Sequence, residues 1–113
     1  MSRAFEAYVE SGRKILEQLG NHTEIAKKVS RIVREAWPDA KVYLFGSVLE
    51  GKYTAMSDID LLIVVDGVDR EEAYRVQAMI YGKIEGPLEL HVASAAQFDR
   101  WYRRLTNHFE EII

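Results

Sequence analysis

Residues 45–60 read FGSVLEGKYTAMSDID, and this stretch joins two apolar runs that we predict to be β-strands. The first run ends at Gly46 and Ser47, and the second begins at Asp58 and Asp60. Because successive side chains of a strand point to opposite faces, Asp58 and Asp60 are expected on the same face. The stretch therefore predicts two carboxylates at the mouth of an apolar strand, close to a glycine-serine turn.

Two carboxylates in this position repel each other and are costly to remove from water, and a bound cation relieves both costs. Mg²⁺ is commonly held by one or two carboxylates together with substrate phosphates. Gly46 would let the backbone approach a ligand closely, and the Ser47 hydroxyl with nearby N–H groups can hold a phosphate. The residues therefore predict a metal and phosphate site; the alternative is that Asp58 and Asp60 are strand-entry charges that face water.

The spacing of these four residues resembles the signature of the nucleotidyltransferase superfamily that includes DNA polymerase beta and the kanamycin nucleotidyltransferases. In that family a Gly-Ser pair is followed after ten residues by Asp-x-Asp, as Gly46, Ser47, Asp58 and Asp60 are here. The resemblance implies a nucleotidyltransferase fold and a third carboxylate on a later strand. Glu89 is our candidate for that carboxylate, although the family usually has aspartate there, which is one methylene shorter.

Three residues near this motif have two interpretations each. Glu89 and His91 share one face of a predicted strand. Glu89 either completes the metal site with Asp58 and Asp60 or is an exposed strand glutamate, and His91 is either a partly exposed sheet residue or helps to position substrate. Lys52 either neutralises a triphosphate or is a solvated loop lysine.

The resemblance implies Mg²⁺-dependent transfer of a nucleoside monophosphate from a nucleoside triphosphate to a hydroxyl group. Two Mg²⁺ ions are expected at Asp58, Asp60 and Glu89, and ATP is the expected substrate. The short chain is most similar to the minimal nucleotidyltransferases (MNT domains), which commonly act as antitoxins to a HEPN-domain toxin. We therefore expect a HEPN-type partner as the acceptor; the alternatives are an inactive module that neutralises a partner by binding, and a nucleotide sensor.

The composition favours one soluble domain over residues 1–113. A net charge of −3 argues against broad nucleic-acid binding or attachment to an anionic membrane. The chain has no cysteine, which excludes disulfides and thiolate metal sites, and it contains no apolar run long enough for a membrane span. We expect a cytoplasmic protein, with self-association or a complex as a further expectation.

Hydrophobic periodicity and turn residues predict a small α/β (α+β) domain with a mixed sheet of at least three strands and about four helices. The last helix is expected to start after Ser94 and to run to the end of the sequence, with Phe98, Phe109 and Ile112 on its apolar side. Phe109, Ile112 and Ile113 are candidates to cover a partner. The expected helices span residues 3–19, 23–36, 69–85 and 95–113, and the expected strands span 41–45, 58–65 and 88–92.

Overall fold

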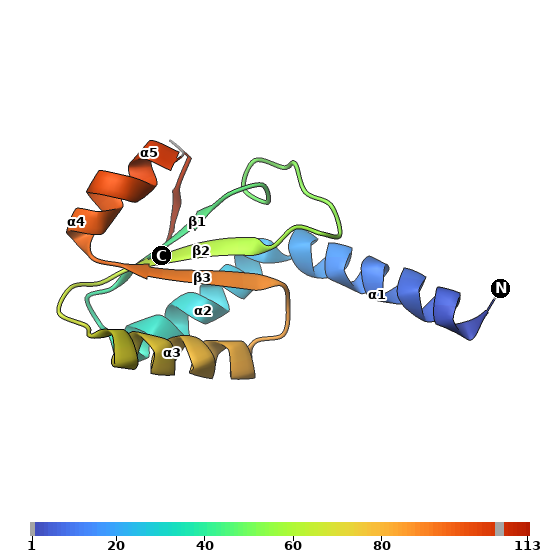
Figure 1. Ribbon diagram of the computed structural model, residues 1–113, viewed down its shortest axis with the longest axis horizontal. Helices are drawn as coiled ribbons and strands as arrows, with labels where there is room; N and C mark the ends of the chain where they lie inside the picture. Colours follow the sequence, from blue (N-terminus) through green and yellow to red (C-terminus); the bar gives the residue numbers. More distant parts are fainter. Residues whose placement is uncertain (1, 106–107) are drawn as a thin grey trace.

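The computed structural model describes residues 2–105 and 108–113, and its centre is a four-stranded sheet with the order β3-β2-β1-β4 (Figure 1). Strands β2 and β3 run parallel, whereas β1 is antiparallel to both of its neighbours. The sheet is therefore mixed, as the sequence predicted. Its strands are β1 (Lys41–Phe45), β2 (Ile59–Val64), β3 (Leu88–Ala93) and β4 (Glu110–Ile112).

The second strand, β2, is the central element of the core. Its apolar residues are buried on both faces of the sheet, which is why its sequence is an apolar run after Asp60 and does not alternate. A parallel pair needs a crossover, and α3 (Arg70–Lys83) supplies it between β2 and β3. The Asp69 side chain caps the start of this helix by accepting a hydrogen bond from the Glu72 N–H.

Two helices cover one face of the sheet, α3 and α2 (His22–Ala36). Their apolar stripes pack on the inward side chains of the strands and form the main core. Val29 and Val33 of α2 and Val76 and Ile80 of α3 are almost completely buried. Within each helix these residues are four positions apart, as the inward side of an amphipathic helix requires.

The opposite face carries a smaller core under a helical stretch that changes pitch twice. This stretch consists of α4 (Ala95–Gln97), a π-helical turn (Phe98–Tyr102) and α5 (Arg103–Leu105). Phe98 packs on Tyr43 of β1 with ring centroids 4.8 Å apart, and Leu62 and Val64 of β2 lie beneath. This second face is also the face of the predicted site residues.

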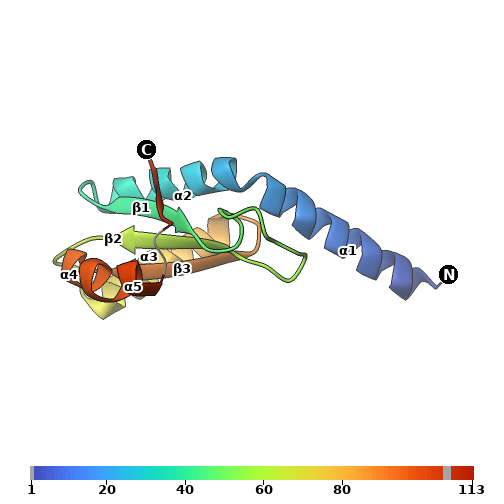
Figure 2. The ribbon, with the colours of Figure 1, turned by 90° about the horizontal axis from the view of Figure 1, so that it is seen from above.

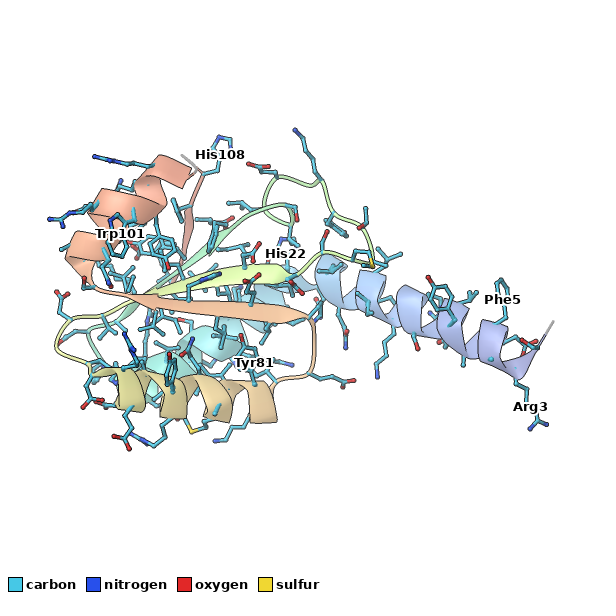
Figure 3. All side chains as sticks on the ribbon, viewed as in Figure 1. Arg3, Phe5, His22, Tyr81, Trp101 and His108 are labelled. Carbon is cyan, nitrogen blue, oxygen red and sulfur yellow. The ribbon has the colours of Figure 1, made fainter. Side chains whose placement is uncertain are left out.

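The first helix, α1 (Arg3–Gly20), extends away from the rest of the molecule in both views (Figures 1 and 2). Leu19 is fully buried in the main core, but Phe5, Tyr8 and Val9 are exposed by 51, 77 and 52%. Figure 3 shows Phe5 and Arg3 near the far end of this helix. The helix itself is confirmed, whereas its apolar side is covered only at its C-terminal end.

Side chains from helices bond to the main chain of both outer strands. The N–H of Leu90 in β3 donates to the Tyr81 hydroxyl at 2.9 Å, and its carbonyl accepts from Gln77 at 3.1 Å. The carbonyl of Ile112 in β4 accepts from Arg34 at 3.0 Å. These bonds tie α3 to β3 and α2 to β4.

The predicted last helix is wrong for residues 108–113, which are not helical and include β4. Residues 106 and 107 of that prediction lie outside the described part of the chain. Phe109 packs on Phe45 and Phe98 but is only partly buried, whereas Ile112 faces the main core at 5% exposure and is not available to cover a partner. Of the three candidates only Ile113, at 89%, is strongly exposed.

Among the described residues, no helix combines the length and the apolar character that a membrane crossing requires.

Two neighbouring isoleucines test the position of β4. Ile112→Ala removes a buried side chain and should lower the free energy of unfolding by roughly 2 kcal/mol or more. Ile113→Ala changes an exposed residue of the same type and should have an effect within about 0.5 kcal/mol. Chemical denaturation of both variants measures the difference; equal effects would contradict the burial of Ile112 in this strand.

Candidate active site

The turn after β1 places a glycine directly against a carboxylate. Gly46 has a φ of 85°, a conformation that L-residues other than glycine rarely adopt. A Cβ atom at this position would lie 2.2 Å from Oδ2 of Asp60, which is far inside van der Waals contact. Glycine is therefore needed here for both its backbone conformation and its lack of a side chain.

Strand register brings the second and third predicted carboxylates together. Asp60 of β2 and Glu89 of β3 are direct neighbours in the parallel pair, and Phe45 of β1 lies beside Asp60 on the other side. Adjacent strands are about 4.8 Å apart, so side chains paired in this way on one face are in contact range. One ligand atom from each of Asp60, Glu89 and His91 lies within 4.8 Å of the other two.

Asp58 lies immediately before β2 and is exposed, whereas Asp60 is half-buried. The described cluster of potential ligands contains Asp60, Glu89 and His91 but does not include Asp58. The charge of Asp58 nevertheless contributes to raising the pKa of Asp60. The structure thus places Asp58 at the edge of the site.

The environment of Asp60 disfavours its ionised form. Burial, a hydrogen bond with Glu89 and the charges of Glu89 and Asp58 together raise the pKa of the Asp60 carboxyl to about 7. Within the described residues no lysine or arginine forms an ion pair with these three carboxylates, and the nearest basic group is the His91 imidazole, 3.7 Å from Glu89. The site therefore concentrates negative charge without a strong cation of its own.

Aromatic side chains flank this cluster on the same face of the sheet. The ring of Phe45 lies 5.6 Å from the His91 ring and 5.3 Å from the Phe109 ring, and Tyr102 lies 6.0 Å from His91. Apolar rings exclude water from one side of Asp60, which explains why burial is the largest cause of its raised pKa. The sequence had placed Glu89 and His91 on one face but gave no indication that Phe109, just before β4, would approach this site.

The two predicted phosphate-binding residues beyond Gly46 lie in the loop that follows it. Ser47 is half-buried, and its carbonyl accepts a hydrogen bond from the Lys52 N–H at 2.9 Å, which folds the loop back on itself. The Lys52 side chain is exposed and lines an open pocket of about 570 Å³ together with Glu50 and Phe109. The structure thus places Ser47 next to Gly46 at the site, and Lys52 at a neighbouring opening.

The donor set of this cluster fits a divalent cation. Asp60 and Glu89 offer hard oxygen ligands, which suit Mg²⁺ and Mn²⁺. A cation there would relieve the repulsion that raises the Asp60 pKa. The imidazole of His91 is a poorer ligand for Mg²⁺ than for transition metals. His91 therefore fits better as a neighbour of Glu89 than as a ligand of Mg²⁺.

Comparison with known proteins gives consistent results. A family model described as "Nucleotidyltransferase domain" matches residues 26–112. A crystal structure of a protein described as a putative nucleotidyltransferase is similar with a TM-score of 0.65 and 28% identity, covering 77% of this chain and 96% of that one. A second protein of this description, from Sulfolobus solfataricus, gives a TM-score of 0.57 at 29% identity, covering 76% of this chain and 78% of that one.

Gly46→Ala tests the contact between the turn and Asp60, with Gly67→Ala as the matched control. Gly67 also has a positive φ of 74°, but a Cβ there would meet nothing within 4 Å. Gly67→Ala should therefore lower the free energy of unfolding by about 1–2 kcal/mol, and Gly46→Ala should lower it further. In urea denaturation, adding Asp60→Ala should return the effect of Gly46→Ala to the control value, whereas equal effects of the two single variants would refute the contact.

The raised pKa of Asp60 predicts how stability depends on pH in the metal-free protein. The folded state keeps this proton up to about pH 7, whereas the unfolded chain releases it near 3.8, so stability falls as the pH rises between these values. Asp60→Asn removes the charge, and at pH 8 with a chelator it should raise the unfolding midpoint by about 4 °C.

The difference between wild type and Asp60→Asn should shrink as the pH is lowered toward 4, and thermal unfolding monitored by circular dichroism measures it. The exposed Asp58 serves as the control, because Asp58→Asn should change the midpoint less than Asp60→Asn does. A wild type that becomes more stable between pH 5 and pH 8 relative to Asp60→Asn would contradict the prediction.

Proposed function

This chain belongs to the nucleotidyltransferase domain family, and from that premise we propose that it transfers a nucleoside monophosphate, AMP in particular, from a nucleoside triphosphate to a hydroxyl group of a partner protein. Membership implies the general use of nucleoside triphosphates and a divalent metal. The observation that supports transfer at this site is the contact of Asp60 with Glu89 under a turn that only glycine can make.

In the proposed reaction the acceptor oxygen forms a bond to the α-phosphorus, and the bond from that phosphorus to the bridging oxygen of pyrophosphate breaks. The proton of the acceptor hydroxyl goes to a carboxylate, for which Glu89 is our candidate because it is the more exposed of the paired acids. Mg²⁺, when held by Asp58, Asp60 and Glu89, supplies charge stabilisation for the phosphates and lowers the pKa of the acceptor.

The chain's own residues then mainly position the reactants. Gly46 leaves room beside Asp60, and the hydroxyl and N–H of Ser47 are proposed to hold the triphosphate. Lys52 is proposed to reach the triphosphate from its exposed position in the loop. The low-dielectric surface of Phe45 and its aromatic neighbours would strengthen these electrostatic interactions.

The acceptor is proposed to be a HEPN-type partner protein, with this chain as its antitoxin. The support is that the described part of the chain consists of one sheet, the helices packed on it and α1. It contains no separate substrate domain. A second candidate function is neutralisation of the partner by binding alone. The position of Asp58 outside the ligand cluster, together with glutamate at the third carboxylate position, favours that alternative.

Transfer of label from α-labelled ATP to a co-expressed HEPN-type partner in the presence of Mg²⁺ tests the proposal. Wild type should label the partner, and the double variant Asp58→Ala with Asp60→Ala should lose at least about 10²-fold in rate because its metal ligands are gone. Glu89→Ala then tests the third carboxylate.

The matched control is Asp39→Ala with Glu35→Ala, which removes two exposed carboxylates near the other end of β1 and should label normally. Absence of labelling by wild type, with the complex still formed, would reject the transferase proposal and support neutralisation by binding.

A further inference from the structure

One side of α1 carries an apolar stripe that the rest of the chain does not cover. Phe5, Tyr8, Val9 and Leu16 lie on it at helical spacing, exposed by 51, 77, 52 and 44%, and Gly12 lies between them. The stripe continues without a break to Leu19, which is fully buried in the main core. The apolar side of α1 is therefore continuous with the main core but is exposed along most of the helix.

An uncovered helix of this kind is poorly stable on its own. An isolated helix needs about 12–15 residues of good helix formers to be even marginal in water, and an interior glycine such as Gly12 weakens it by about 1 kcal/mol relative to alanine. Tertiary packing normally supplies the missing stability. The family match begins at residue 26, so α1 lies outside the part of the chain that the family shares.

We propose that α1 of one copy packs antiparallel against α1 of a second copy, so that the protein forms a dimer through this helix. The charges of α1 favour this occupant: Arg3, Arg13 and Lys14 balance Glu6, Glu10 and Glu17. A helix with three charges of each sign complements a reversed copy of itself, whereas a membrane surface would favour a strongly basic polar face.

The order of residues along the stripe fits an antiparallel pair centred near Glu10. In that register Tyr8 of each copy packs over Gly12 of the other, and Phe5 packs near Ile15. The space in front of Gly12 is open, since a Cβ there would meet nothing within 4 Å. The large ring and the missing side chain are therefore complementary, in the way that interdigitating helices require.

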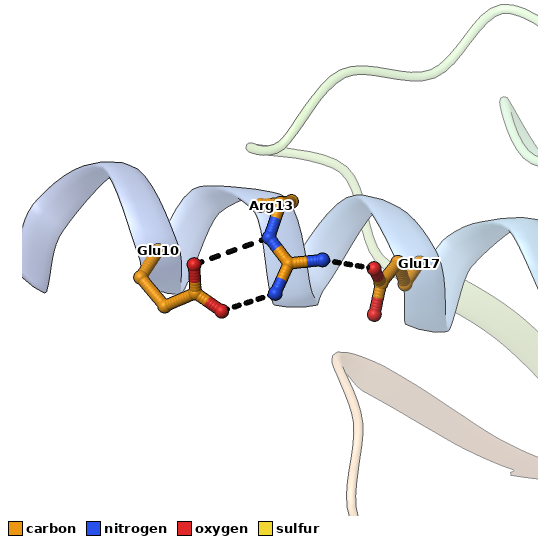
Figure 4. Close-up of polar contacts among 3 residues, drawn as sticks. All are labelled: Glu10, Arg13 and Glu17. Carbon is orange, nitrogen blue, oxygen red and sulfur yellow. Dashed lines mark hydrogen bonds and ion pairs between the residues drawn. The ribbon is translucent and has the colours of Figure 1, made fainter.

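The charged residues of α1 lie beside and behind the apolar stripe. Arg13 pairs with Glu10 and with Glu17 along the helix (Figure 4), and Lys14 reaches Glu85 at 2.7 Å. Glu6 and Arg13 lie along one border of the stripe. In the antiparallel register Glu6 of one copy faces Arg13 of the other, and the pair occurs twice by symmetry.

The shape of the molecule permits this arrangement. Because α1 extends beyond the body (Figures 1 and 2), antiparallel pairing puts the two sheets at opposite ends of the helix pair, where they do not collide. An α1 of 18 residues is about 27 Å long. The four exposed apolar side chains of each copy, with the open part of Ile15, would bury on the order of 1,000 Å² in total, which is about the lower limit for a specific interface.

Analytical ultracentrifugation of the full chain tests the dimer. Wild type should sediment as a dimer at micromolar concentrations, and Val9→Glu should weaken dimerisation roughly tenfold or more, because it places a carboxylate in the apolar contact. Ala7→Glu adds the same charge to the polar side of α1 and should leave dimerisation unchanged. A monomeric wild type, or equal effects of the two variants, would overturn the proposal.

Cysteine cross-linking tests the orientation, and the absence of natural cysteines makes it specific. Chains carrying Tyr8→Cys, mixed with chains carrying Gly12→Cys under mild oxidation, should form the mixed disulfide faster than either variant cross-links to itself. Faster self-cross-linking of each variant would indicate parallel helices and overturn the antiparallel pairing. Both experiments are independent of nucleotidyl transfer.

Discussion

The pairing of Asp60 with Glu89 on adjacent parallel strands is the constraint around which this molecule is built. Like charges at this distance repel, and the register of β2 and β3 holds them together regardless. The sheet can do so because β2 is buried on both faces and cannot slip by one residue without turning its whole apolar set outward. The stability of the main core therefore holds two carboxylates side by side in spite of their repulsion.

The two faces of the sheet serve different purposes. Ile59, Leu61 and Ile63 point toward α2 and α3, and the residues between them point toward the carboxylates and the aromatic rings. The side chains on one face of β2 thus build the main core, and Asp60 on the other face belongs to the candidate site. The position of Asp60 on the central strand also explains its raised pKa, because burial there disfavours the charged form and the neighbouring Glu89 adds a hydrogen bond and a like charge.

Local sequence predicted most of the fold. The three long helices and the first three strands match within a few residues, since each has a clear period and capping or turn residues such as Asp69 and Gly46. The prediction for the last segment was wrong for a physical reason. Phe109 and Ile112 are spaced like neighbours on a helix, whereas pairing with the free edge of β1 makes residues Glu110–Ile112 a strand. Likewise, the spacing of apolar residues in α1 defines an apolar side but contains no information on whether the rest of the chain covers it. Of the candidate site, the sequence placed Asp60 and Glu89 correctly on one face, whereas the approach of Phe109 depends on tertiary structure.

The hydrogen bonds from Tyr81 and Gln77 to Leu90 have a consequence for solubility. An exposed outer strand offers free N–H and C=O groups to any other extended chain, and this is a common route to aggregation. In β3 the groups of Leu90 are already occupied by α3, and Arg34 similarly engages the carbonyl of Ile112 at the opposite edge. At each edge of the sheet a helix side chain thus occupies a main-chain group that a strand of another molecule would need for pairing.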